Sequence, residues 1–407
     1  MSDLRVSDID LANEPLAIEN GTSVRRDRLP LHRPWIGEEE VRAVANAMCS
    51  GHLSGRGPIG REVEAELSAI LGTPTLFVSS CTAALEISLT LSGVGRGDEV
   101  ICPSFAFVSA ATSVVRAGAI PVFADIEPDT FNIDPADIES RITPETRAII
   151  VVHYAGHACD MDRILEIASR RGLKVIEDAA HAFGASAEGR PLGTIGDFGC
   201  FSFHGTKDIV CGEGGALVCR RHDDAHRAEI VCEKGTNRTQ FIRGDIDHYT
   251  WVDEGSSYAA SDVLASLLQA QLGRFPAILA RKRELAERLT SLLEPIRGLV
   301  QLPRERPGVS SSWHLYAILV PAQVRDDVIR ALRHEGLDAA FHYIPLHSSP
   351  FARERLRRPL PRLPHTDRVS TSLIRLPFFA SMSDDDLEDV ARATIKVVTR
   401  FVDHGRM

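Results

Sequence analysis

The sequence predicts an α/β protein, with a large, mixed but mainly parallel sheet in a first domain and a smaller α+β domain after it. Between residues 76 and 180, short β-branched or aromatic runs alternate with amphipathic segments. This pattern is typical of parallel strands joined by helices that cover both faces of a sheet. Beyond residue 298, shorter strands and helices are mixed, as in HLYAILV (314–320) and VRDDVIRALRHEG (324–336).

The expected elements begin with a helix at 36–51, where Val41, Val44 and Met48 recur at helical spacing behind acids in the first turn. Strand-like and amphipathic segments then follow at 76–80, 82–94, 98–105, 108–118, 120–126, 146–156, 161–172 and 173–180. After residue 195, the strand-like runs FGCFSFHGTK and GGALVC flank a glycine-rich bend. A long helical stretch at 261–293 leads into the second domain, which ends in an amphipathic helix at 383–402.

Three regions follow from this order. Residues 1–27 are polar and aperiodic, so we expect a mobile N-terminal arm there. The large domain is expected at 28–275 and the small one at 276–407, with the long helix between them. A chain of 407 residues that is 44% hydrophobic is long enough to bury both cores.

Composition excludes several classes of function. The net charge of −10 disfavours a nucleic-acid groove, which needs a basic face. No stretch approaches the roughly 18 consecutive apolar residues of a membrane span, and the acidic start MSDLRVSDIDLANEP is no secretory signal. We therefore expect a cytoplasmic protein. The eight cysteines form no Cys-x-x-Cys pair or His/Cys cluster, so we expect small buried hydrophobes and neither a metal site nor disulfides.

Amine chemistry has few possible positions in this chain. The 46 basic residues include only five lysines, Lys174, Lys207, Lys234, Lys282 and Lys396. Arginine keeps its proton at any working pH, whereas a desolvated lysine can become a nucleophile. Four of the five have an ordinary solvated explanation. Lys207 differs because its neighbours in SFHGTKDIVCGEGGA (202–216) are small or aromatic.

The glycine motif GRGPIG (55–60) has the glycine spacing of a dinucleotide-binding fingerprint but not its structural context. That fingerprint follows a strand and opens a helix that receives a pyrophosphate. Here a helical segment precedes it and Pro58 interrupts it, so we interpret it as a loop.

Three segments together indicate a cofactor site. In SSCTAAL (79–85), Thr82 stands at a helix start where free N–H groups can hold an anion, although a plain helix cap fits as well. In VIEDAA (175–180), a buried strand ends in Asp178, which could pair with a protonated ring nitrogen. His181 could contact the same ring. The alternative is a helix-capping acid and a histidine whose hydrogen bonds are satisfied within the protein. Lys207 would be the Schiff-base amine and Phe107 an aromatic face. Pyridoxal phosphate (PLP) needs all of these groups.

On these motifs the chain resembles the sugar aminotransferases of the DegT/DnrJ/EryC1/StrS family, PLP enzymes of fold type I (aspartate aminotransferase-like). The resemblance extends from LHRPWIGEEEV (31–41) to RLPFFASMS (375–383). It implies a homodimer with shared active sites, a catalytic pair Lys207 and Asp178, and no metal. It also implies cofactor contacts from Thr82, Ala83, Phe107, Asp178, His181, Ser202 and Lys207.

Further motifs, among them SCTAALE, EKGTNRTQF and FHYIPLH, are similar to the subgroup that makes dTDP-4-amino-4,6-dideoxygalactose. This implies the dTDP-4-keto-6-deoxy sugar dTDP-4-dehydro-6-deoxy-D-glucose as substrate and L-glutamate as amino donor. The chain departs from the wider family at Cys81, Ala106 and Asp208, where glycine, threonine and asparagine are common. Ser257, in GSSY, replaces an asparagine that reaches the partner subunit's phosphate.

Substrate contacts and the exact activity have alternatives. Arg238, Tyr343 and His347 are polar groups that could face the sugar nucleotide, or satisfied residues of a second-domain strand. Two alternative enzymes are a nucleotide-sugar 3-aminotransferase and a PLP-dependent 3-dehydratase, although a dehydratase would carry histidine in place of Lys207. A third alternative is a non-catalytic regulator that binds PLP or a sugar nucleotide. The glycines of GRGPIG alone would suggest an NAD-linked oxidoreductase.

Overall fold

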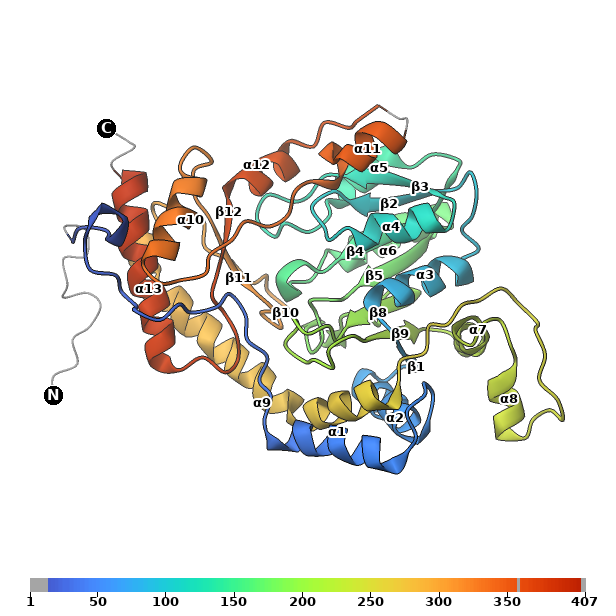
Figure 1. Cartoon of the computed structure of the whole chain (residues 1–407). Helices are drawn as coiled ribbons and strands as arrows, with labels where there is room; N and C mark the ends of the chain where they lie inside the picture. The colour runs from blue at the N-terminus through green and yellow to red at the C-terminus, as the bar shows by residue number, and fades with distance from the viewer. Residues whose placement is uncertain (1–13, 357–358, 404–407) are drawn as a thin grey trace.

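The computed structural model describes residues 14–356 and 359–403, which form a large and a small domain joined by one long helix (Figure 1). A seven-stranded sheet with the order β1-β9-β8-β5-β4-β2-β3 is the centre of the large domain. Strand β9 is antiparallel to β1 and β8, and the other neighbours pair in parallel. The strands are β1 (Thr75–Val78), β2 (Glu99–Pro103), β3 (Ile120–Ala124), β4 (Thr146–Val152), β5 (Lys174–Asp178), β8 (Phe198–Ser202) and β9 (Gly215–Cys219). The predicted mixed, mainly parallel sheet is confirmed.

Helices cover both faces of this sheet, as predicted. The core on one face includes side chains of α2, α5, α6 and the first half of α9, and the core on the other face includes α3, α4 and α7. Because β1, β2 and β9 are buried along their whole length, their sequences are apolar runs without alternation. The helices are α2 (Pro58–Leu71), α3 (Cys81–Leu91), α4 (Ser109–Arg116), α5 (Pro135–Arg141), α6 (Met161–Arg171), α7 (His222–Cys232), α8 (Arg238–Arg243) and α9 (Asp262–Leu292).

Helix α1 (Glu38–Ser50) forms where the spacing predicts it, but its apolar stripe does not face the core. Val41 is 64% exposed and Met48 is 62% exposed, whereas Glu40 is fully buried. Glu40 accepts hydrogen bonds from Arg274 and from Gln271 of α9, at 2.8 and 2.7 Å. The inward face of α1 is therefore polar and paired, which the hydrophobic spacing alone did not indicate.

The small domain packs two antiparallel strands against helices and the second half of α9. Its main elements are β11 (Tyr316–Leu319), β12 (Leu373–Leu376), α10 (Arg325–His334) and α13 (Asp384–Val398). Ile278 of α9 belongs to the large core and Leu285 to the small one, so the two cores meet within the helix, a few residues after the predicted boundary. Two helices of this region, α11 (Pro350–Arg355) and α12 (Pro364–Ser372), lie beside the large domain (Figure 1). The short strands β6 (Ser186–Ala187), β7 (Arg190–Pro191) and β10 (Val309–Ser310) form a separate three-stranded sheet.

The segment predicted as a mobile arm divides into two parts. Residues 1–13 lie outside the described residues, and 14–27 contact the small domain. Leu16 is 1% exposed in the small-domain core. The backbone amides of Ala17 and Val24 donate to the Glu335 carboxylate at 2.8 and 3.0 Å. A distant carboxylate thus holds this polar stretch, a contact that no local pattern reveals.

The sequence predicted the exposure of cysteines better than that of lysines. Seven of the eight cysteines are buried and free, and Cys49 is exposed, which confirms that most are small buried hydrophobes. The solvated explanation was wrong for two lysines, because Lys282 is 0% and Lys396 is 2% exposed. Lys396 pairs with Glu335 at 3.1 Å. Each buried ammonium has a carboxylate from a distant part of the chain, as burial of a charge requires.

The GRGPIG motif does not form a dinucleotide site. It connects α1 to α2, so no strand precedes the helix. The Asp262 carboxylate accepts from the amides of Gly57, Ile59 and Gly60 at 3.1, 3.1 and 3.0 Å. The position at which this helix N-terminus would hold a pyrophosphate is occupied by a side chain of the protein itself, which agrees with the rejection of a dinucleotide site. The motif is a loop only as far as Gly57, because Pro58 begins α2.

Helix α9 is the one helix among the described residues whose length and composition would allow it to cross a membrane, with a mean hydropathy of 1.3 in its most apolar stretch. It contacts α1, α2 and α13, and 33% of that stretch is buried in the chain itself. The core helix of a protein without membrane spans meets the same criterion, so this single helix is weak evidence for a span.

Candidate active site

The site lies where the carboxyl ends of β5 and β8 meet the N-terminus of α3. The two strands are parallel neighbours, with Asp178 opposite Cys200. Gly215 of β9 permits the helix start to approach, because a Cβ atom there would lie 2.4 Å from the carbonyl carbon of Ser80. Ligands of open α/β sheets bind at this edge. The structure thus brings together the three segments that the sequence singled out.

Lys207 lies in the loop between β8 and β9, where it is half-buried. Its backbone amide donates to His204 O at 2.8 Å, so the loop turns tightly before the lysine. Burial lowers the pKa of its amine, and Arg375 adds to the lowering, while Asp178, Cys81 and Asp208 oppose it. A lysine with a lowered pKa is more often neutral at working pH, as a nucleophilic amine must be.

Asp178 ends β5 and is 5% exposed. Its carboxylate accepts from the Ala180 amide at 3.1 Å, and the Cys81 thiol lies 3.7 Å from the same oxygen. Burial raises the pKa of this carboxyl, whereas the Ala180 amide and Lys207 lower it. A buried carboxylate with so few partners is suited to hold a cationic group of a ligand.

Hydroxyl groups gather at the start of α3. Ser80 caps the helix by accepting from the Ala83 amide at 3.1 Å, so the expected Ala83 donor already has a partner. The hydroxyls of Thr82 and Ser109 are 2.7 Å apart. Ser202 ends β8, and its hydroxyl accepts from the His204 amide at 3.4 Å. Sequence reasoning missed Ser80, although it stands two residues before Thr82, and Ser109, which only the fold places beside Thr82.

Imidazole and aromatic rings form the walls. His181 packs on His314, with ring centroids 4.4 Å apart, and its Nδ1 accepts from the Ala155 amide at 3.3 Å. Burial and the charge of Lys207 hold the pKa of His181 well below its usual range, so its ring is neutral. Phe107 is 58% exposed, 6.4 Å from the Tyr343 ring. An exposed aromatic face at this edge is available to a planar ligand.

Most of the chain matches a known protein family. The model of the DegT/DnrJ/EryC1/StrS aminotransferase family matches residues 34–394. The chain belongs to this family. The spore coat polysaccharide biosynthesis protein SpsC of Bacillus subtilis is 36% identical over 383 residues, which cover 92% of this chain and 98% of SpsC.

Solved structures agree with this aminotransferase fold. The aminotransferase TlmJ from Streptoalloteichus hindustanus is 34% identical, with a TM-score of 0.83 over 90% of this chain and 97% of TlmJ. The putative sugar aminotransferase Spr1654 from Streptococcus pneumoniae is 28% identical, with a TM-score of 0.86 over 93% and 100%. Spr1654 is known in PMP and PLP forms. The protein is thus a sugar aminotransferase of PLP fold type I, and its cofactor is pyridoxal phosphate.

The residues of this aminotransferase fit that cofactor. It carries an aldehyde, a ring nitrogen and a phosphate. Lys207 offers an amine of lowered pKa and Asp178 a buried carboxylate. The hydroxyls of Thr82 and Ser109 meet at a helix N-terminus, which favours a phosphate, and Ser202 offers a further hydroxyl at the end of β8.

Arg375 of β12 is a site residue that sequence reasoning missed. Its backbone pairs with Ala340, and its charge lowers the pKa of Lys207, His181 and His342, so Arg375 acts electrostatically on groups of the site. Its Nε is buried without a hydrogen-bond partner, and among residues 14–356 and 359–403 no carboxylate forms an ion pair with it. The one sequence signal is an arginine within the apolar run SLIRLPFF.

The expected sugar-nucleotide contacts do not all lie at this site. Tyr343 does, since its pKa responds to Asp178 and Arg375. His347 is buried, 2.7 Å from the Ser104 hydroxyl, so the alternative of a satisfied structural residue describes it better.

Arg238 and Ser257 are both exposed and lie together at a different position, beside Glu233. Arg238 is 3.8 Å from the Glu233 carboxylate, and Ser257 bridges to the Glu233 backbone. Arg238 lines a cavity of about 210 Å³ with Arg56, Arg61 and Arg243. No contact in the described residues joins either of them to Lys207 of the same chain.

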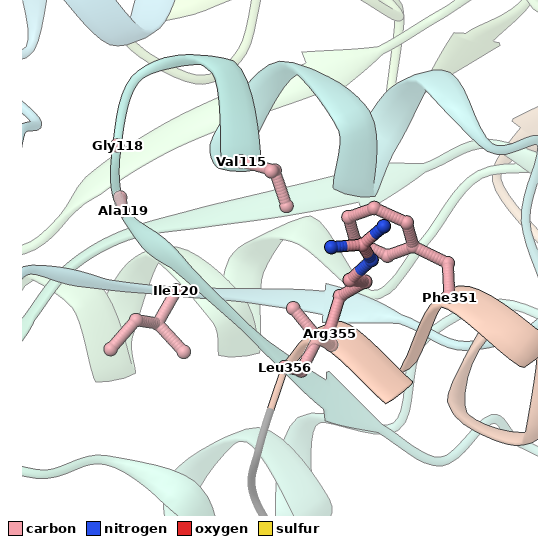
Figure 2. A pocket seen from close by; sticks show the side chains of 7 residues that line it. All are labelled: Val115, Gly118, Ala119, Ile120, Phe351, Arg355 and Leu356. Atoms are coloured by element: carbon pink, nitrogen blue, oxygen red, sulfur yellow. The ribbon is translucent and has the colours of Figure 1, made fainter. Parts of the chain in front are cut away.

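A cavity of about 550 Å³ lies elsewhere, between α4, β3 and α11 (Figure 2). Phe351 and Arg355 of α11 line this cavity from one side, and Val115 and Ile120 line it from the other (Figure 2). Its lining includes none of the predicted site residues. Cavity size therefore does not locate the chemistry of this protein, whereas the titratable groups around Lys207 do.

Proposed function

We propose that this aminotransferase transfers the amino group of L-glutamate to C4 of dTDP-4-dehydro-6-deoxy-D-glucose, giving a dTDP-4-amino-4,6-dideoxyhexose and 2-oxoglutarate. The proposal depends on the juxtaposition of the Lys207 amine and the buried Asp178 carboxylate at the edge of the sheet. The choice of substrate is supported by the motifs SCTAALE, EKGTNRTQF and FHYIPLH. The printed name of SpsC, a polysaccharide biosynthesis protein, agrees with a sugar substrate.

The side chains have distinct tasks in this proposal. When bound, PLP supplies an aldehyde that condenses with amines and a ring that accepts electrons. Lys207 would hold the aldehyde, and its amine, when free, would take the Cα proton of glutamate and give a proton to C4 of the sugar. Asp178 keeps the ring nitrogen protonated. Thr82 and Ser202 would hold the phosphate with Ser109 beside Thr82, whereas the Ala83 amide is bonded to Ser80. Phe107 and His181 would flank the ring.

Arg375 is the proposed anchor for the glutamate carboxylate. In glutamate the α-carboxylate is attached to the carbon that loses its proton to Lys207, so it must lie close to that amine. The diphosphate of the sugar nucleotide is several bonds away from the reacting C4. A guanidinium without a carboxylate partner, within the electrostatic reach of Lys207, suits the nearer anion.

Arg375→Lys should raise the glutamate concentration needed for half-maximal rate by about 10- to 100-fold, the loss of a bidentate charged contact. The rate is followed through the absorbance of the bound cofactor, separately with glutamate and with the sugar nucleotide. Arg163→Lys on the exposed side of α6 is the matched control. Weaker sugar-nucleotide binding with unchanged glutamate dependence would instead assign Arg375 to the diphosphate.

The active form proposed is a cytoplasmic homodimer with shared sites. Arg238 and Ser257 lie together and apart from Lys207 of their own chain, which is consistent with contacts to the partner's cofactor or substrate. Exposed apolar side chains such as Val41 and Met48 also need a cover. Ser257 has a shorter side chain than the asparagine usual there, so its contact would be weaker.

The decisive test offers the purified protein dTDP-4-dehydro-6-deoxy-D-glucose with L-glutamate and determines the product by NMR. We expect an amine at C4, and the C4 configuration distinguishes the galacto from the gluco product. A 3-aminotransferase would leave this 4-keto sugar without an amine and would form one at C3 only from the isomeric 3-keto sugar, which is offered in parallel. Loss of the C3 hydroxyl would establish the dehydratase. A protein that binds PLP and the sugar nucleotide without forming 2-oxoglutarate would be the non-catalytic regulator.

A further inference from the structure

We propose that Asp208, Lys282 and His314, here named the Asp208 cluster, position the Lys207 loop and balance the charge beside the Lys207 amine. In this view Asp208 and Lys282 act as a neutral pair whose members cannot be removed singly without changing the proton affinity of Lys207. The inference rests on the proposed role of Lys207. It concerns residues that touch neither the substrate nor the cofactor, so they are positioning residues.

Lys282 of α9 is the buried centre of the cluster. Its ammonium lies 3.0 Å from the Asp208 carboxylate, outside hydrogen-bond geometry, so the attraction is that of an ion pair. It donates to the backbone oxygens of His314 and Phe378 at 3.1 and 3.4 Å. It also lies 4.0 Å from the centre of the Phe378 ring. The Asp208 carboxylate and these two backbone oxygens together stabilise a fully buried ammonium.

Asp208 and His314 connect Lys282 to the proposed cofactor site. Asp208 directly follows Lys207, and its second oxygen is 2.9 Å from His314 Nδ1. The His314 ring packs on His181, with centroids 4.4 Å apart. The cluster therefore links three parts of the chain: α9, the loop of Lys207 and the segment before β11. It fixes both the lysine and the histidine that flank the proposed cofactor.

The electrostatic consequence follows from the groups that face Lys207. Asp178, Cys81 and Asp208 raise the pKa of its amine, and Arg375 and burial lower it. The neighbouring imidazoles belong to His32, His181, His314 and His342. If Asp208 loses its charge, the ammonium of Lys282 stays unbalanced near Lys207. If Lys282 loses its charge, the Asp208 carboxylate has no opposing charge and raises the pKa of Lys207 further.

The test uses Asp208→Asn, Lys282→Met and the double variant, each as the PLP-loaded enzyme. The visible absorbance of the bound cofactor, followed against pH, gives the proton dissociation constant of the Lys207 nitrogen. We expect this constant to rise about tenfold in Asp208→Asn and to fall about tenfold in Lys282→Met. The double variant should return to within about twofold of the wild type, since it removes both charges. Shifts of one sign in both single variants, or no recovery in the double variant, would overturn the proposal.

Lys396→Met is the matched control, because Lys396 is also a buried lysine with a carboxylate partner, Glu335. It should lower the melting temperature as Lys282→Met does and leave the absorbance titration unchanged. An equal shift in Lys396→Met would reduce the Asp208 cluster to an ordinary structural contact. If Lys282→Met does not fold, Asp208→Asn and the double variant still make the comparison, because only the single variant leaves a charge unbalanced.

A second readout separates this inference from the proposed function. Without cofactor, Lys207 is acetylated by a small reagent across a pH series and quantified by mass spectrometry, which is simple with five lysines. The variants should shift the midpoint for Lys207 in the same directions. If acetylation shifts while no cofactor absorbance depends on Lys207, the cluster stands and the role of Lys207 fails. If acetylation does not shift, the cluster fails whatever the cofactor does.

Discussion

Lys207→Ala should abolish both the visible absorbance of the bound cofactor and the transfer of amino groups. In the proposed reaction the amine binds the aldehyde and moves protons at two carbons, so its loss should lower the rate with glutamate by about a thousandfold or more. The measurement is a single-turnover absorbance trace with glutamate, together with the spectrum of the resting protein. Lys234→Ala removes a lysine whose side chain is 58% exposed and should leave both signals unchanged.

An alanine variant with wild-type turnover would refute the assignment of Lys207. The pH dependence gives an independent check on the same residue. Burial lowers the pKa of the Lys207 amine, so the neutral amine is reached at a lower pH than for a solvated lysine. The rate with glutamate should rise with pH and reach its plateau below the usual range of lysine titration. A profile that rises only in that usual range would show that the amine is solvated.

The fold and the centre of the site could be predicted because local pattern determines them. The apolar start of VIEDAA favours a buried strand, which β5 is as far as Asp178, and a parallel sheet brings the carboxyl ends of its strands to one edge. Asp178 and Lys207 therefore had to lie near each other once β5 and β8 were neighbours. The same reasoning assigned GRGPIG to a loop, since no strand precedes it.

What the sequence did not reveal depends on long-range partners. Lys282 seemed solvated within Arg-Lys-Arg, yet it is buried because Asp208 and the His314 and Phe378 carbonyls surround it. Arg375 stood in an apolar run without any sign of a role. Val41 marked a helix correctly but not the direction that it faces. Periodicity indicates which residues share a face, and only the packed chain decides what covers that face.

Asp178→Asn should keep the cofactor bound and slow the glutamate reaction by about 100- to 1,000-fold, the usual cost of one lost electrostatic contact in a water-excluded site. Asparagine can still accept from the Ala180 amide, but it carries no charge to hold a proton on the ring nitrogen. Single-turnover absorbance measures the rate. Asp197→Asn is the matched control, because Asp197 pairs with Lys174 at the opposite end of β5 and should leave the rate unchanged.

Asp178→Asn should lower the rate without lowering the melting temperature, and this difference separates a catalytic from a structural carboxylate. Burial raises the pKa of Asp178 above its unfolded value, so the folded state disfavours the ionised form and loses stability as the pH rises through that range. Without cofactor, Asp178→Asn removes this penalty, and its melting temperature at pH 7 should equal or exceed that of the wild type. A large drop in melting temperature would mean that the Asp178 carboxylate serves the fold. A slow but equally stable variant would mean that the protein tolerates a buried charge because the cofactor requires it.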